Sequence, residues 1–104
     1  MSFKLVPNPT FEAKVGFHTP GEQAQQKITF VFRYRDTEQL KEFQEEIKGK
    51  GNVEVVLLLA EGWKGIDLPF NEESLAELFR YHHSAPERIV QAYYAELIGA
   101  RLGN

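Results

Sequence analysis

Two stretches near the N-terminus alternate apolar and polar residues with a period of two, and this pattern constrains the fold more than any other feature. Every second residue is apolar within residues 11–18 and again within residues 27–35. Successive side chains of a strand point to opposite faces, so this period indicates half-buried strands. Thr19-Pro20-Gly21 between them is a turn signal. We therefore expect two antiparallel strands, at about 11–18 and 27–35, with their apolar sides on one face.

After residue 35 the apolar spacing changes to three and four residues, which is the period of a helix. Each expected helix begins at a residue typical of an N-cap. Asp36 with Gln39, and Ser84 with Glu87, fit a capping box, and Asn71 fits a cap that Phe70 and Leu75 would flank as a hydrophobic staple. These signals predict helices at about 37–48, 72–83 and 85–101.

Residues 53–61 are ambiguous between strand and helix. The segment begins with β-branched residues, which favour a strand, and ends with Leu, Ala and Glu before Gly62, which favour a helix. A short apolar run cannot be resolved by periodicity. The residues alone leave both alternatives open.

Length, charge and residue usage exclude several classes of protein. With 104 residues the chain is expected to form a single domain, residues 1–104. Its formal net charge of −3 argues against nucleic acid as the main partner, because phosphate binding needs a basic surface. It has no cysteine, which excludes disulfides and thiolate chemistry. We also expect no membrane segment and no signal peptide, and hence a cytoplasmic location.

The candidate catalytic and metal-binding residues have simpler explanations. His82 and His83 are adjacent, so on a helix they point about 100° apart and cannot bind one ion together. His18 lies far away in the sequence. The paired acids are explained as a solvated helix face and a helix start. We therefore expect no catalytic residue, no metal site and no cofactor, although a small enzyme using one of the three histidines stays as an alternative.

Aromatic residues are the better candidates for function, because Trp and Tyr are common anchors at protein interfaces. Trp63 is flanked by glycines, which suggests a bend where the ring either fills the core or is exposed as an anchor for a partner. The last expected helix has a wide apolar face, and two adjacent tyrosines on it cannot share one orientation. The residues expected to contact a partner are Trp63, Phe70, Tyr93, Tyr94 and Ile98.

The order and spacing of these signals resemble the small tail assembly chaperones of long-tailed bacteriophages and prophages. The resemblance covers almost the whole chain, from about Phe3 to Asn104. The C-terminus departs from the pattern of the family. Related chains commonly end with a basic residue and Asn, whereas this chain ends with Arg101-Leu102-Gly103-Asn104. The motifs that carry the resemblance are Pro9-Thr10-Phe11, Thr29-Phe30, Gly62-Trp63-Lys64-Gly65-Ile66, the segment 69–75, Ala85-Pro86, Ile89, Ala92-Tyr93 and Leu97.

The resemblance implies a non-enzymatic protein in the host bacterial cytoplasm that binds the tape measure protein and assists tail tube assembly. It implies that residues 53–61 are helical, which gives an α+β chain with two strands followed by four helices. The tail tube protein is a further expected partner, and a homo-oligomer stays open. The alternative is a structural tail or head-completion component of the particle.

Overall fold

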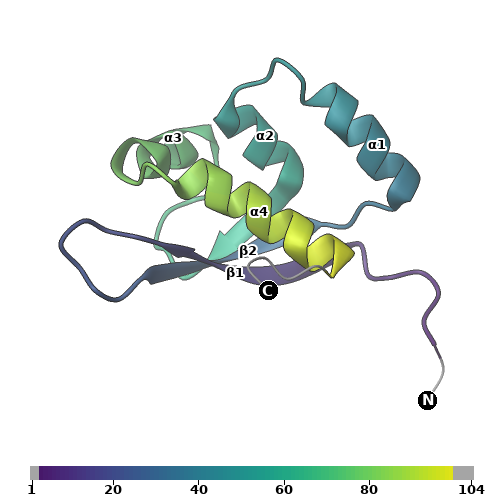
Figure 1. Ribbon diagram of the computed structural model, residues 1–104, viewed down its shortest axis with the longest axis horizontal. Helices are drawn as coiled ribbons and strands as arrows, with labels where there is room; N and C mark the ends of the chain where they lie inside the picture. The colour runs from purple at the N-terminus through teal and green to yellow at the C-terminus, as the bar shows by residue number, and fades with distance from the viewer. Residues whose placement is uncertain (1–2, 100–104) are drawn as a thin grey trace.

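A computed structural model describes residues 3–99 of the chain. The strands form one layer and the helices gather on one of its faces (Figure 1). The expected α+β class, with N-terminal antiparallel strands and four helices, is confirmed. In chain order the elements are β1 (Thr10–Phe17), β2 (Gln26–Arg33), α1 (Thr37–Glu46), α2 (Asn52–Leu59), β3 (Ala60–Lys64), α3 (Glu72–Tyr81) and α4 (Ala85–Ile98).

The sheet has the order β1-β2-β3, and both neighbouring pairs are antiparallel. The alternating segments form β1 and β2, each within two residues of its predicted bounds. Phe11 lies opposite Phe32 in the register of β1 and β2, and Phe30 lies opposite Trp63 in that of β2 and β3. Residues that face each other in a ladder project to the same side, so the three strands share one aromatic face.

The third strand corrects the prediction for residues 53–61. The helix predicted there exists as α2, but it ends at Leu59, and Ala60 and Glu61 begin β3. The register of β2 and β3 shifts between Val31 and Phe32, which is a bulge. A strand of five residues with a bulge and a central Gly62 shows almost no alternation. The β-branched residues that favoured a strand therefore lie in α2, whereas Ala60 and Glu61, taken as signs of a helix, begin the strand.

The helix starts agree with two of the three predicted caps. Asp36 and Gln39 form the full capping box of α1, and the Asn71 side chain accepts a hydrogen bond from the backbone N–H of Ser74 at 2.9 Å. The capping box predicted at Ser84 is wrong, because that side chain makes no capping hydrogen bond and Ser84 has helical φ and ψ. Helix α4 ends at Ile98, before the predicted end at residue 101, which lies outside the described residues.

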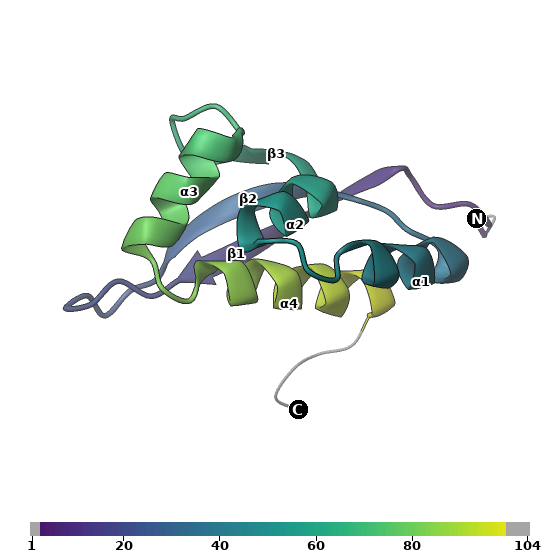
Figure 2. The same ribbon diagram turned by 90° about the horizontal axis from the view of Figure 1, so that it is seen from above.

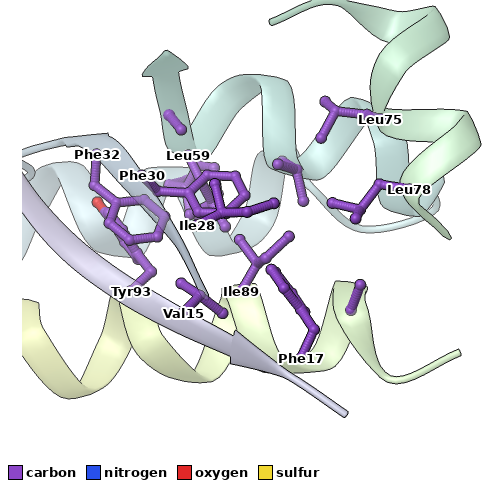
Figure 3. Close-up of a cluster of buried hydrophobic side chains, with 14 residues drawn as sticks. Val15, Phe17, Ile28, Phe30, Phe32, Leu59, Leu75, Leu78, Ile89 and Tyr93 are labelled. Atoms are coloured by element: carbon purple, nitrogen blue, oxygen red, sulfur yellow. The ribbon is translucent and has the colours of Figure 1, made fainter. Parts of the chain in front are cut away.

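The buried side chains fill the space between the aromatic face of the sheet and the helices (Figure 3). Helix α4 runs along β1, and α2 packs against both α4 and α3 (Figure 2). The core consists of Val15, Phe17, Ile28, Phe30, Phe32, Phe43, Val56, Leu59, Ala60, Leu75, Leu78, Ala85, Ile89 and Tyr93.

Helix α1 is the most weakly attached element. Phe43 is its only buried residue, whereas α3 and α4 each bury three. The opposite face of the sheet carries charges instead of a second layer, including the ion pairs Lys64–Glu12 and Arg33–Glu61. Within residues 3–99, no helix has the length and apolar character needed to cross a bilayer.

Candidate partner-binding surface

Three aromatic rings meet where β3 leads toward α3. The ring centroids of Trp63 and Phe70 are 5.2 Å apart with an interplanar angle of 80°, and Phe30 lies 5.8 Å from Trp63 in a similar edge-to-face arrangement. Edge-to-face contacts are favourable because the positive edge of one ring meets the negative face of another. The two predicted partner-binding residues of this region, Trp63 and Phe70, are thus in direct contact.

The indole of Trp63 also fixes the loop between β3 and α3. Its Nε1–H donates a hydrogen bond to the carbonyl oxygen of Leu68 at 2.8 Å. The loop leaves the strand at Gly65, whose φ of +93° is a conformation that other residues rarely adopt. Trp63 therefore lies in a strand rather than in the predicted bend, and its partly exposed ring packs against the core, as one of the two alternatives expected. Its visible effect is to hold the loop in place.

A shallow groove of about 640 Å³ lies between this loop and α3. Glu73, Ala76, Glu77 and Arg80 follow helical spacing, so they share the face of α3 that points away from the core. Leu68 forms the opposite wall and is 49% exposed. We call this hollow the α3 groove; its lining residues are Leu68, Pro69, Asn71, Glu73, Ser74, Ala76, Glu77 and Arg80.

A second cluster lies around Tyr93, at the other end of the core. The Tyr93 hydroxyl donates a hydrogen bond to the carbonyl oxygen of Arg33 at 2.8 Å and accepts one from Arg35 Nη1 at 3.2 Å. Burial raises the pKa of Tyr93 above its ordinary value of 10.0, and the hydrogen bond from Arg35 partly offsets this rise. Tyr93 has no exposed surface, so a partner cannot contact its side chain directly in this structure.

The remaining predicted residues, Tyr94 and Ile98, lie near the C-terminal end of α4. The Tyr94 ring is half-buried and packs edge-to-face on Tyr93 at 5.6 Å. Ile98 is 63% exposed. Helix α4 begins beside α3 and ends near the first residues of β1, so these residues lie away from the α3 groove (Figure 1). The five predicted residues therefore form two separate groups.

The histidines do not come together with acidic side chains. His82 is half-buried, with its ring 6.2 Å from that of Phe17, and His18 and His83 are exposed. Within the part of the chain that the structure describes, no three metal-ligating side chains are grouped to hold an ion.

Sequence reasoning missed the α3 groove and the contacts of Arg35. A signal for the groove was present: Leu68-Pro69 is an apolar pair in a loop, and the helical spacing of Glu73, Ala76, Glu77 and Arg80 places polar or small residues on one face of the helix that follows. The contacts of Arg35 left no such signal. Its partners Leu58 and Tyr93 are 23 and 58 residues away in the sequence.

A family model described as a phage tail assembly chaperone matches residues 1–104, the whole chain. No curated protein and no solved structure matches the chain.

Proposed function

Because this chain belongs to the phage tail assembly chaperone family, we propose that it binds the tape measure protein and holds it while tail tube subunits assemble. The match over the whole chain is the observation that carries the proposal. Membership of the family implies interaction with other phage tail proteins. The tape measure protein is proposed as the client, and the tail tube protein as a second partner met during assembly.

The surface of the chain supports a holding role. Large apolar side chains are exposed at several separate places, in the segment before β1, beside α3 and at the end of α4. A chaperone for a long helical client needs apolar contacts distributed over its surface, since a helix is recognised through its apolar stripe. The exposed apolar residues are Phe3, Leu5, Val6, Leu68, Tyr81 and Ile98.

This work requires binding alone, so we propose that the protein is not an enzyme. It would act in the cytoplasm of the host bacterium, where tails assemble, and be released before the particle is complete. Its contacts with the client would be made by exposed apolar groups whose neighbours are fixed in place, such as Leu68 beside Trp63.

Co-expression with the tape measure protein of the same phage tests the proposal. We expect the tagged chain to retain that protein on an affinity column and to raise its soluble yield. A chain that retains none of it under conditions where both are folded would refute the proposal. Mass spectrometry of purified virions provides a second test, because a chaperone should be missing from them, whereas a structural tail component would be present.

A further inference from the structure

The α3 groove lies between two walls that the fold holds in place. One wall is a helix face and the other is a loop held by the hydrogen bond from Trp63 to Leu68. Ser74 is buried at the floor and Ala76 is small, so a second helix could approach α3 closely. The loop stands beside α3 on the side away from α4 (Figure 2).

The apolar part of the groove fits the stripe of an amphipathic helix. Leu68 and Pro69 on the loop and Ala76 on α3 present apolar surface, and Glu73 and Glu77 lie next to Ala76 along the same helix face. A helix laid into such a groove would bury its stripe against the apolar residues. Side chains flanking that stripe would then reach the two carboxylates.

The groove is lined by the carboxylates of Glu73 and Glu77 and by the cation of Arg80, and two further carboxylates lie close by in the sequence. Residues 65–81 contain four carboxylates and one cation, a net charge of −3, whereas the rest of the chain has eleven acidic and eleven basic residues. Arg80 is the cation, and its guanidinium lies 5.4 Å from the ring centroid of Tyr81. The carboxylates are Asp67, Glu72, Glu73 and Glu77. The formal net charge of the protein thus equals that of the loop and α3.

We propose that the α3 groove binds an amphipathic helix whose apolar stripe is flanked by lysine or arginine. This inference rests on the proposed function, for which it specifies the chemistry of the client segment. Opposite charges around an apolar contact favour the correct partner and disfavour helices with acidic flanks. Exposed charge pairs are individually weak, so the apolar stripe supplies contact area and the flanking cations supply selectivity.

Two synthetic helical peptides of about 20 residues test the selectivity directly. Both have the same leucine and alanine stripe, and they differ only in flanking lysines or flanking glutamates. Binding is followed by calorimetry and by fluorescence of Trp63, the only tryptophan of the chain. We expect the lysine-flanked peptide to bind about tenfold more tightly at low salt, and this ratio to fall toward one as salt screens the charges.

Charge reversal in the groove should reverse the preference. The variant Glu73→Lys/Glu77→Lys is expected to bind the glutamate-flanked peptide more tightly. Glu45→Lys/Glu46→Lys on α1 changes the net charge by the same amount on exposed residues outside the groove, and it should keep the preference of the original chain. If the double variant is unstable, Glu77→Lys alone replaces it, because Glu77 lies beyond the first turn of α3. This single variant should shift the free-energy difference between the two peptides by about half as much as the double variant.

The inference is overturned if the original chain binds both peptides equally, or if the α1 variant shifts the preference as much as the groove variant. Retention of the whole tape measure protein is measured separately on the same samples. If the chain retains that protein but shows no preference between the peptides, the proposed function stands and the assignment of the groove fails. If it retains none, the proposed function itself fails.

Discussion

The guanidinium carbon of Arg35 lies 4.0 Å from the centroid of the Phe43 ring, and the same side chain donates a hydrogen bond to the carbonyl oxygen of Leu58 at 2.7 Å. Arg35 follows β2, Phe43 belongs to α1, and Leu58 lies in the last turn of α2. One side chain thus joins the end of β2 to α1 and α2, and its hydrogen bond to Tyr93 reaches α4 as well. It also places a positive charge at a helix C-terminus, where the dipole favours a cation.

Replacement of Arg35 by alanine should therefore lower the free energy of unfolding by about 2–3 kcal/mol, since a charge-assisted hydrogen bond and a cation–π contact are lost together. Arg35→Lys should recover less than half of this loss, because lysine lacks the planar guanidinium group that lets arginine contact several partners at once. Urea unfolding measures both changes. Arg88→Ala on the exposed side of α4 is the control and should change stability by less than about 0.5 kcal/mol.

Tyr93→Phe should lower stability by about 1 kcal/mol at neutral pH, because it leaves the Arg33 carbonyl oxygen without its donor. The folded-state pKa of Tyr93 is raised above 10.0, so the native state favours the neutral phenol. That contribution is fully present below pH 10 and is lost as pH rises through the raised value. The difference between the two proteins should therefore shrink above pH 10, and a constant difference up to pH 11.5 would contradict this reasoning.

Phe43→Ala should release α1 while the sheet stays folded. Phe43 is 2% exposed and is the only buried residue of that helix, so it makes the main contact of α1 with the core, to which Leu40 and Ile47 add only partly buried contacts. A buried Phe→Ala change removes about 3–5 kcal/mol of packing. Hydrogen exchange should become at least about tenfold faster in α1 than in the original chain, with a smaller change in β2. Equal acceleration in both elements would show instead that α1 is part of the cooperative unit.

The three N-cap positions give a matched set. Asp36→Ala and Asn71→Ala should each lower stability by about 1 kcal/mol, because each side chain accepts a hydrogen bond from a helix N–H. Ser84→Ala should change it by less than about 0.5 kcal/mol, since Ser84 makes no such bond. Thermal unfolding of the three variants checks the order. A loss at Ser84 as large as the other two would mean that its hydroxyl caps α4 in solution.

Trp63→Phe keeps an aromatic ring against Phe70 but removes the hydrogen bond to Leu68. We expect a loss of about 1 kcal/mol in stability and faster hydrogen exchange in residues 65–70. Affinity for the tape measure protein should fall as well, because the wall of the α3 groove is no longer fixed. Phe70→Leu is the companion variant, because it shortens the ring contact and leaves the indole bond intact. If Trp63→Phe left exchange in the loop unchanged, the bond would have no role in ordering it.

The sequence was informative where structure depends on neighbours in the chain. The alternation that predicts β1 and β2 and the capping box at Asp36 are local patterns, and the structure confirms them. β3 escaped prediction because its pairing of Trp63 with Phe30 is made across 33 residues, and because the apolar residues 55–59 of α2 lead directly into it without a change of pattern.

The candidate site was predictable only in part, for a related reason. Trp63 and Phe70 were expected to contact a partner, and the structure places them together behind the α3 groove. Tyr93 was chosen because the apolar face of the last helix is wide, and the sequence alone does not show which residues of that face point toward the core. Burial then placed Tyr93 in the core, with Ile89 one turn before it. Whether the other four residues contact the client stays a prediction.

The hydrogen bond from Trp63 to Leu68 has a consequence for which client segments would bind best. The loop beside α3 is ordered when the chaperone folds, so on the proposed function little of its conformational entropy is lost at binding. Most of the conformational entropy lost at binding would then be that of the client segment, which folds from a flexible chain into a helix. Affinity among segments with the same apolar stripe should therefore follow their intrinsic helix propensity, and a single glycine at a solvent-facing position of the client should weaken binding by about fivefold.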